Sequence, residues 1–485
     1  MENPLGKYEP VIGLEIHAQL TTNTKAYSSD INEYGALPNT NVSPVTLGHP
    51  GTLPRFNKKS IEYAVKLGLA CNADITRDMH FDRKNYFYAD LPKGYQITQD
   101  KTPICTGGKI LIKGDDGNEK AINLTRIHME EDSGKSIHDM DPFNTLVDLN
   151  RAGTPLVEIV TEPELKSGDE AYSYLTEVRK LLRYLEICDG NMEEGSMRCD
   201  VNISIMPRGS KEFGQRVEIK NMNSIRNVQR AIAFEINRHA DLLEEGGKIA
   251  QETRNFDATT GSTVAMRKKE DAHDYRYFPE PDLTALHVTQ GYIDAIHETM
   301  PALPNDLFKK YVNELGLSEY DALNLTDSKG IALYFEELIS HCKNYKTAAN
   351  WMMGAIKSHL NQNALEIDSF LISPEQIAGL INIIEEGKIS HSVAEQKVFP
   401  ELLANPEMAP IDIATNNNWI QKSDTSELED IIRTIFKDNP SEVERFKNGE
   451  KKLTGFFMGQ IMKETRGAAD PKATAQILNK LVNEN

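Results

Sequence analysis

Hydrophobic and polar residues follow two different rhythms along the chain. Up to about Leu286, apolar and polar residues alternate in short runs separated by Gly, Pro and Asn, a pattern typical of strands. Beyond that point apolar residues recur every three or four positions, which predicts short amphipathic helices. Two helices are also expected within the first part, one beginning after Ser167 and one running from Ile225 to the glycine pair at 246–247. The pattern predicts an α+β fold in which a strand-rich domain precedes helical domains.

Proline-marked segments indicate where the domains divide. A chain of 485 residues is too long for a single hydrophobic core, so two or three domains are expected. Prolines cluster at 300–304 and again at 405–410. We predict a first domain at 1–293, a helical domain at 294–405 and a helical tail domain at 406–485.

The strand expected at 11–20 has one apolar face and one polar face. Apolar residues fill every second position, whereas Glu15, His17 and Gln19 lie between them. Neighbouring positions on one face of a strand are roughly 7 Å apart, so Glu15 and His17 could reach one ion. On this strand alone, an ordinary solvated face is the simpler explanation.

Other predicted strands repeat this division, and the repetition favours a functional surface. Glu158 stands alone inside an apolar run, where an unpaired charge would be costly, so it requires a metal or a basic partner. If these strands belong to one antiparallel sheet, their polar faces could line a single concave surface. The polar residues of the other strands are Arg126, His128, Glu130, Glu131, Asp132, Arg198, Asp200, Asn202, Ser204, Arg216, Glu218 and Lys220.

Such a surface would suit phosphoryl transfer. Oxygen ligands with one or two imidazoles favour a hard cation such as Mg²⁺. Phosphoryl transfer needs that ion and nearby positive side chains, which the arginines and lysines above could provide together with Lys84, Lys93 and Lys135. The sequence has neither a Walker loop nor the glycine fingerprint of dinucleotide-binding folds. The residues therefore indicate a class of chemistry and not yet a reaction.

Composition narrows the setting in which this chemistry would occur. No apolar run approaches the ~20 residues needed to cross a bilayer, and the first residues lack the apolar region of a secretory signal, so we expect a cytoplasmic protein without membrane contact. Five scattered cysteines support neither a disulfide framework nor a Cys-rich zinc site.

Charge argues against a protein that binds nucleic acid over its whole surface. The formal net charge is −19, yet the residues from Ser441 to the end include 8 Lys and Arg against 6 Asp and Glu. Phosphate binding is driven by clustered Lys and Arg. The tail is therefore where an RNA contact is expected, and its candidate phosphate contacts are Lys447, Lys451, Lys452, Lys463 and Arg466.

Several ordered segments resemble the B subunit of the glutamyl/aspartyl-tRNA amidotransferase family. The resemblance covers essentially the whole chain. The segments that carry it are 11–17 (VIGLEIH), 38–41 (PNTN), 81–88 (FDRKNYFY), 93–96 (KGYQ), 128–132 (HMEED), 150–160 (NRAGTPLVEIV), 193–200 (EEGSMRCD), 275–281 (YRYFPEP) and 455–462 (GFFMGQIM).

The resemblance implies a cradle-like catalytic domain followed by a helical domain and a tail domain that contacts tRNA. It implies ATP- and Mg²⁺-dependent activation of the side-chain carboxylate of Glu on tRNA(Gln) or Asp on tRNA(Asn). Ammonia from glutamine hydrolysed in the A subunit would then displace the phosphate, and a small C subunit would brace the pair. The implied catalytic residues are Glu15, His17, Glu131, Asp200 and Glu218, which with Glu130 and Glu158 would also bind the metal. The residues expected to bind ATP are Lys84, Lys93, Arg126, Lys135, Arg198 and Lys220.

One departure from the family pattern concerns zinc. Many members carry a Cys-based zinc loop after the first strand, but the corresponding positions here are Ser28, Asp30, Ser43 and Thr46. These side chains cannot form a thiolate site, so we expect no structural zinc.

Two other functions remain open on the sequence. A non-catalytic tRNA-binding scaffold would leave the polar strand faces merely solvated. A stand-alone metal-dependent hydrolase would act through a bound water and without partner chains.

Overall fold

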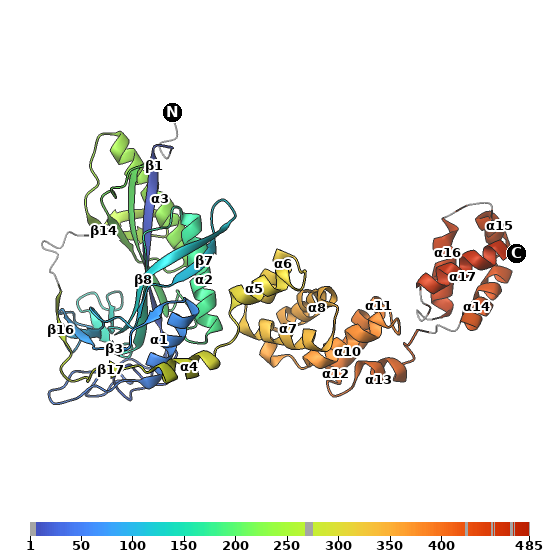
Figure 1. Ribbon diagram of the computed structural model, residues 1–485, viewed down its shortest axis with the longest axis horizontal. Coiled ribbons are helices and arrows are strands. Elements are labelled where there is room, and N and C mark those ends of the chain that lie inside the picture. Colours follow the sequence, from blue (N-terminus) through green and yellow to red (C-terminus); the bar gives the residue numbers. More distant parts are fainter. Residues whose placement is uncertain are drawn as a thin grey trace. The chain divides into compact units, whose positions relative to one another are not determined.

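The computed structural model describes residues 6–266, 275–421, 425–447, 450, 452–465, 469 and 471–484. It divides into two compact units, Met1–Leu303 and Pro304–Asn485. The first unit contains the sheets and the second is helical, as the residue pattern predicted (Figure 1). The boundary falls ten residues after the predicted end of the first domain.

A ten-stranded sheet forms the centre of the first unit, in the order β15-β14-β13-β12-β1-β11-β8-β6-β2 with β7 paired to β8. Its strands are β1 (Tyr8–Gln19), β2 (Asp74–Ile75), β6 (Cys105–Thr106), β7 (Lys109–Lys113), β8 (Glu119–Glu131), β11 (Pro155–Thr161), β12 (Met197–Pro207), β13 (Val217–Lys220), β14 (Glu252–Asp257) and β15 (Ser262–Ala265).

Every pair in this sheet is antiparallel except β13–β14, which is parallel. The strands that were expected to share one antiparallel sheet, β1, β8, β11, β12 and β13, do pair antiparallel, and the parallel pair adds β14, which was not among them. The physical reason is the connection: helix α3 (Ile225–Glu244) crosses over between the two strands and returns the chain in the same direction.

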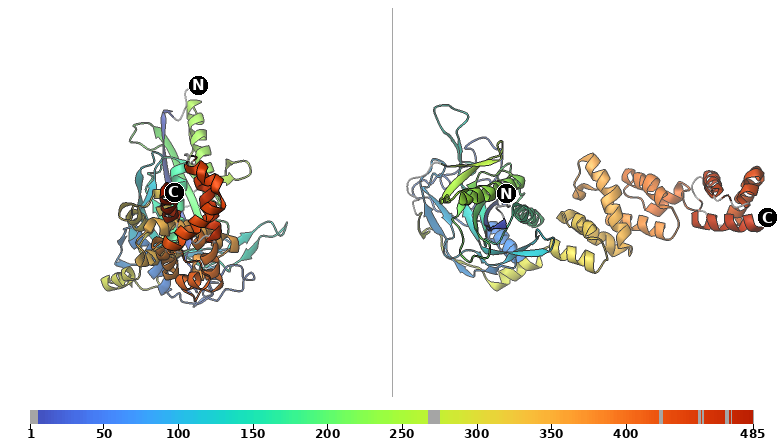
Figure 2. Two further views of the ribbon diagram at one scale, coloured as in Figure 1. Left: turned by 90° about the vertical axis from the view of Figure 1, so that its right-hand side faces the viewer. Right: turned by 90° about the horizontal axis from the view of Figure 1, so that it is seen from above.

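One face of the sheet is buried under helices. The apolar side chains of β1, β11 and β12 belong to the same core as the apolar faces of α1 (Lys58–Ala70), α2 (Gly168–Tyr184) and α3. Two further views show α2 and α3 against the sheet (Figure 2). Ser167 caps α2 by accepting a hydrogen bond from the Glu170 N–H, and Ser224 caps α3 in the same way. The helices thus leave the other face of the sheet for the polar side chains.

Three small sheets complete the first unit. They consist of β16 (Arg276–Pro279), β4 (Asp82–Asn85) and β5 (Tyr95–Thr98), of β9 (Lys135–Ile137) and β10 (Leu146–Asp148), and of β17 (Leu286–His287) and β3 (Asp78–Met79). Helix α4 (Gln290–Glu298) follows them along the chain.

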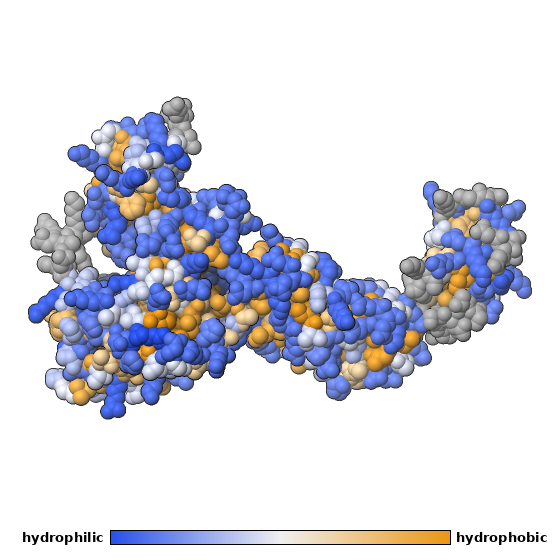
Figure 3. Space-filling model, viewed as in Figure 1, coloured by the Kyte–Doolittle hydropathy of each residue, from blue (hydrophilic) through white to orange (hydrophobic). Residues whose placement is uncertain are grey.

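The second unit is built from helices. They are α5 (Pro304–Asn313), α6 (Glu319–Leu325), α7 (Lys329–His341), α8 (Tyr345–Trp351), η2 (Met352–Ile356), α9 (Lys357–Asn363), η3 (Ile367–Ser369), α10 (Pro374–Glu385), α11 (His391–Val393), η4 (Ala394–Val398), α12 (Phe399–Ala404), α13 (Pro410–Asn416), α14 (Thr425–Asp438), α15 (Pro440–Lys447), α16 (Leu453–Glu464) and α17 (Pro471–Glu484). The last four pack around Ile432, Phe457 and Leu478. In the described ranges no helix is long and apolar enough to span a bilayer. The face drawn in Figure 3 is mostly hydrophilic, with separate apolar patches.

The loop after β1 is held by a carboxylate. Asp30 accepts hydrogen bonds from the Thr46 hydroxyl and, at 2.9 Å, from the Ser43 N–H. The hydroxyl oxygens of Ser28 and Thr46 lie 3.3 Å apart. Burial alone would raise the pKa of Asp30, but the hydrogen bonds from Thr46 and Ser43 outweigh it and lower that pKa. The four positions expected to replace the zinc ligands thus meet at one point.

A buried carboxylate ties α3 to the edge of the main sheet. Glu235 is fully buried and forms ion pairs with Arg238 at 2.7 Å and with Arg254 of β14 at 3.2 Å. It also accepts a hydrogen bond from Thr263 of β15. Burial opposes ionisation, but His239 and Arg238 outweigh it and lower the pKa of Glu235 to about 2.

We expect Glu235→Gln to lower the free energy of unfolding by about 3 kcal/mol at pH 7, since the carboxylate pKa falls by more than two units on folding. A lowered pKa stabilises the fold above the unfolded value, roughly 4.3, and this contribution is lost as the pH falls toward about 2. Urea unfolding of both proteins between pH 7 and pH 3 measures the difference. Glu244→Gln, on the exposed part of the same helix, should change stability little because its pair with Lys7 is solvated. If Glu235→Gln lowered the free energy of unfolding by the same amount at every pH, the lowered pKa of Glu235 would be contradicted.

We expect metal analysis to find no stoichiometric zinc in the wild-type chain, and about one zinc after simultaneous Ser28→Cys, Asp30→Cys, Ser43→Cys and Thr46→Cys substitution. The physical reason is that these positions already converge, so four thiolates would surround one ion. The absorption of Co²⁺ bound to the variant would report tetrahedral thiolate ligation. Zinc in the wild-type chain, or none in the variant, would show that the loop has been misread.

Candidate active site

Polar side chains from adjacent strands form two rows across the open face of the sheet. Residues paired in register on neighbouring strands point to the same face. The first row consists of His128 on β8, Glu158 on β11, His17 on β1 and Arg198 on β12. The second row consists of Arg126 on β8, Glu15 on β1, Asp200 on β12 and Lys220 on β13, with Val160 of β11 between the first two.

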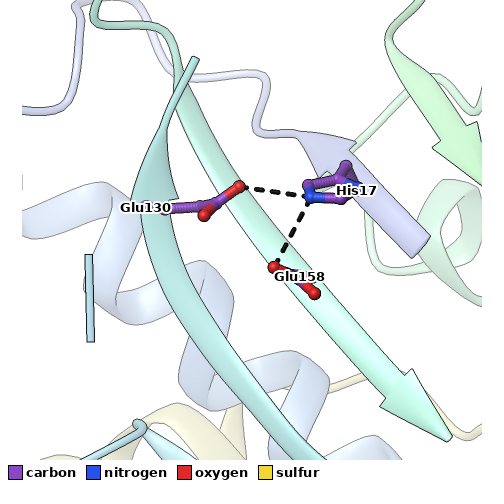
Figure 4. A group of neighbouring side chains, drawn as sticks. All are labelled: His17, Glu130 and Glu158. Atoms are coloured by element: carbon purple, nitrogen blue, oxygen red, sulfur yellow. Dashed lines mark ion pairs between the residues drawn. The ribbon is translucent and has the colours of Figure 1, made fainter. Parts of the chain in front are cut away.

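The first cluster is a trio of His17, Glu130 and Glu158 (Figure 4). The His17 Nε2 lies 3.4 Å from a Glu130 oxygen and 3.5 Å from a Glu158 oxygen. His128 approaches the same carboxylates, with its Nε2 3.0 Å from Glu158 and 3.8 Å from Glu130. Two imidazoles and two carboxylates therefore meet on three neighbouring strands.

The second cluster is a trio of Glu15, Asp200 and Glu218. Lys220 lies beside it, with its Nζ 2.6 Å from Asp200 and 2.9 Å from Glu218. Two neutral donors orient the outer carboxylates: Asn202 donates to Glu15 at 2.8 Å and Thr253 donates to Glu218 at 2.8 Å. In the described ranges these two trios are the groups of His, Cys, Asp or Glu whose ligand atoms all lie within 4.8 Å of one another.

The first trio holds a proton. Burial disfavours the imidazolium of His17, but Glu158 and Glu130 outweigh burial and raise the pKa of His17 to about 9. Burial likewise opposes ionisation of Glu158, yet His128 and His17 hold its pKa well below the usual range. At neutral pH His17 is therefore charged in the metal-free site, and Glu158 is ionised.

The second trio is short of positive charge. Burial, and then the neighbouring Glu158, Asp200 and Glu218, raise the pKa of Glu15. Lys220 compensates the far side only: burial opposes its charge, but Asp200 and Glu218 outweigh burial and raise its pKa. A cation placed beside Glu15 would relieve this repulsion.

Glu131 lies apart from both trios. Adjacent residues on a strand point in opposite directions, so Glu131 faces away from Glu130. Its carboxylate pairs with Lys93 and accepts a hydrogen bond from the Ile97 N–H at 2.9 Å. Both side chains line a cavity of about 90 Å³ with Lys25, whose pKa burial lowers to about 8. Glu131 and Lys93 were expected at the metal and at ATP, and the structure places neither with the trios.

The other positively charged side chains expected at the site also divide into those near the trios and those away from them. Arg198 donates to Asp132 at 2.7 Å at the edge of the first row. Arg126 donates to the Asp100 carbonyl at 2.9 Å. Burial raises the pKa of Glu130, and the charges of His17 and, more weakly, of Lys84 oppose this rise without cancelling it. Lys135 is exposed on the separate β9–β10 hairpin. Arg126, Lys84, Arg198 and Lys220 are thus near the trios, whereas Lys135 is not in contact with them.

Of the contributors His128, Asp132, Asn202 and Thr253, only Thr253 was not identified from the sequence. His128, Asp132 and Asn202 were named with the polar strand faces but were not chosen as metal or catalytic residues, although His128 shares the strand parity of Glu130 and Asn202 that of Asp200. Asp132 lies just beyond β8 and accepts from Gln19 at 2.9 Å as well as from Arg198. Thr253 joins through the parallel pairing of β14 with β13, which no local pattern indicates.

Comparison with known proteins identifies the family of this chain. Residues 10–294 match the GatB/GatE catalytic domain, and residues 333–482 match the GatB domain. A protein from Persephonella marina, named as the B subunit of aspartyl/glutamyl-tRNA(Asn/Gln) amidotransferase, is 48% identical over 477 residues, covering 98% of this chain and 100% of the relative. Proteins of the same name from Thermodesulfovibrio yellowstonii (46%; 99% of this chain, 100% of the relative) and Clostridium botulinum strain Hall (45%; 98% of each) are similar over the same span. The chain therefore belongs to the GatB/GatE family and groups with the B subunits of aspartyl/glutamyl-tRNA amidotransferases.

Proposed function

We propose that this chain activates the side-chain carboxylate of Glu-tRNA(Gln), Asp-tRNA(Asn) or both with ATP and Mg²⁺, and then lets ammonia form the amide. The relatives are named as B subunits, which implies partner chains. We propose that the A subunit hydrolyses glutamine to supply the ammonia and that a cytoplasmic heterotrimer is completed by the C subunit. We also retain the three proposed domains, with 406–485 as the part that contacts tRNA.

The observation that supports this function best is the pair of acidic trios on one polar face, backed by a buried apolar face. A merely solvated face would not need to bury Glu130, and to bury most of Glu158, beside two histidines. A scaffold that only binds tRNA has no use for such an arrangement. A stand-alone hydrolase would use the same donors. It would act without tRNA and ATP, whereas the proposed function requires both.

The trios fit divalent cations by the chemistry of their donors. Glu15, Asp200 and Glu218 offer only carboxylate oxygens, the ligands that Mg²⁺ prefers. Burial and the neighbouring carboxylates raise the pKa of Glu15, and a bound cation would favour its ionised form. His17 with Glu130 and Glu158 would hold a second ion after losing its proton. A bound Mg²⁺ would neutralise charge on the transferring phosphate.

The residues of this chain would position and neutralise anions. In the proposed reaction a carboxylate oxygen of the aminoacyl group attacks the γ-phosphorus of ATP and ADP leaves. Ammonia then attacks the carbonyl carbon of the acyl phosphate, and phosphate and a proton are released. Because the carboxylate and ATP are both anionic, the lysine and arginines at the rim, Lys220, Arg198 and Arg126, would hold them against the acidic trios. Asn202 and Thr253 would keep the carboxylates of the second trio oriented.

We expect Glu15→Gln, His17→Ala and Glu218→Gln each to reduce tRNA-dependent ATP hydrolysis and amide formation at least about a hundredfold, because each removes a ligand or a positioning charge. The assay is amide formation on Glu-tRNA and Asp-tRNA by the reconstituted complex, with ATP and Mg²⁺ present or omitted. Hydroxylamine in place of ammonia should trap the acyl phosphate as a hydroxamate.

A matched control for these variants lies on the same strand. Glu9 belongs to β1 and shares the parity of Glu15, but it pairs with Lys166 at 2.7 Å, away from both trios. Glu9→Gln should keep wild-type turnover. Wild-type activity in any two of the three site variants would refute the metal assignment.

The tail prediction concerns affinity for tRNA. Lys447, Lys452 and Lys463 form no ion pair in the described part of the tail, whereas Lys480 pairs with Glu429 at 3.0 Å. The other two expected contacts, Lys451 and Arg466, lie outside the described residues.

Substituting Lys447, Lys452 and Lys463 together by Ala should weaken tRNA binding and lower the slope of log affinity against log salt by about 2–3, because fewer counterions are released. Binding is measured at several salt concentrations, and Lys480→Ala is the control. Deleting residues 440–485 should raise the KM for aminoacyl-tRNA and leave glutamine hydrolysis by the partner chain unchanged. If both variants bind tRNA like the wild-type complex, the contact lies elsewhere in the chain.

A further inference from the structure

The polar face of the main sheet continues past the second trio onto its edge strand, β15. Arg254 of β14 pairs with Glu235 of α3, so it faces the helices. Because side chains alternate along a strand, Thr253 and Asn255 of β14 face the other way, with the trios. Val264 of β15 is the register partner of Asn255 and therefore shares this face.

Two exposed apolar side chains, Val264 and Met266, lie on this edge, and we call them the edge patch. Met266 donates its N–H to the Thr253 carbonyl at 3.0 Å, so it follows Val264 along the same face. Val264 is 58% exposed and Met266 is 46% exposed, although the strands beside them present carboxylates, amides and cations. Apolar side chains next to a few well-placed polar groups are the usual lining of a small-molecule site.

A pair of amides flanks the edge patch. Asn221 follows Lys220 directly, and its φ of 67° lies in the left-handed region that Asn adopts more readily than most residues. Its Nδ2 donates to the Oδ1 of Asn255. Within the ranges that the structure describes, the Asn221 Oδ1 and the Asn255 Nδ2 have no further hydrogen-bond partner, which leaves one acceptor and one donor. Adenine presents a donor next to an acceptor along its edge, and this pair complements both.

Positive side chains lie between the edge patch and the inner carboxylates of the second trio. Arg216, at the start of β13, and Lys220, at its end, share the strand parity of Glu218. Burial opposes the charge of Glu218, but Lys220, the hydrogen bond from Thr253 and Arg216 outweigh burial and lower its pKa. A chain of phosphates that crosses β13 toward the trio would therefore meet two positive charges.

We propose that the edge patch and the two amides bind the adenine of ATP, whose phosphates cross β13 toward the second trio. This inference rests on the proposed function and says where its nucleotide binds. Neighbouring strands lie about 4.8 Å apart, so β15 is roughly 10 Å from β13 and roughly 14 Å from β12. The ribose and the α- and β-phosphates separate adenine from the γ-phosphate by a distance of this order when ATP is extended. The γ-phosphate would then lie at Asp200 and Glu218.

The chemistry of the edge patch favours a nucleotide over an RNA base. Proteins stack unpaired RNA bases mainly on aromatic rings or on guanidinium planes, and the edge patch has neither. The positive charges of Arg216 and Lys220 lie on the side of the patch that faces the trio, where the triphosphate of a bound nucleotide would be.

The test uses the full-length chain in its reconstituted complex with Mg²⁺. Binding of radiolabelled ATP is measured by equilibrium dialysis with uncharged tRNA present, so that no turnover occurs. Inorganic tripolyphosphate, which has no base, is the competitor. We expect Val264→Ala combined with Met266→Ala to weaken ATP binding about tenfold, the effect of losing about two buried methyl groups, and to leave the Ki of tripolyphosphate unchanged.

Two further variants test the same site. Asn255→Ala should weaken ATP binding about fivefold through the loss of one hydrogen bond. Val264→Ile combined with Met266→Leu should restore ATP binding, since both changes keep the apolar surface.

Met140 provides the matched control. It is 72% exposed and lies between β9 and β10, which form a separate small sheet. Met140→Ala makes the same truncation as Met266→Ala and should leave the binding of ATP, tripolyphosphate and tRNA unchanged.

The outcomes separate this inference from the proposed function. Wild-type ATP binding in the double alanine variant, when the wild-type complex forms the amide, overturns the edge-patch assignment alone. Equal weakening of ATP and tripolyphosphate would show a disturbed trio and also overturn it. Weaker tRNA binding with unchanged ATP binding overturns it in favour of an RNA base. A wild-type complex that binds no ATP, or forms no amide on Glu-tRNA or Asp-tRNA, overturns the proposed function, and this assignment with it.

Discussion

Both acidic trios depend on the register of β1 between β11 and β12. That register sets His17 opposite Glu158 and Glu15 opposite Asp200, while Leu14 and Ile16 enter the core. Because side chains alternate along a strand, a slip by one residue would bury the acids and expose the apolar residues. Burial of the apolar face under the helices therefore fixes the positions of the polar side chains on the other face. No helix contributes a side chain to either trio.

The sheet brings carboxylates close enough to repel one another, and positive charge compensates this repulsion differently in the two trios. In the first, a charged His17 lies between Glu130 and Glu158. In the second, Lys220 compensates one side and Glu15 is left with its pKa raised. Rigid backing by the core keeps the carboxylates together despite this cost. The polar face thus holds its carboxylates together on a rigid sheet, as the proposed cation sites require.

Sequence alternation predicted the polar face well because strand periodicity is a local property. It placed Glu15, Asp200 and Glu218 on one surface, and the structure brings them together. Both Glu130 and Glu131 were named as site residues, although the alternation of Arg126 and His128 with the apolar residues between them places only Glu130 on the polar face. The parallel pair could not be predicted for another reason. It joins β13 to β14 across helix α3, and pairing between distant segments leaves no periodic signal in the chain.

The hydrogen bonds that Asp30 accepts from Thr46 and Ser43 determine which conditions can disrupt the loop after β1. A thiolate-bound zinc is lost to chelators and to oxidants, whereas Asp30, Thr46 and the Ser43 N–H offer neither a metal to remove nor a sulfur to oxidise. Acid is what this loop is sensitive to instead, because protonating Asp30 removes the charge that its donors stabilise.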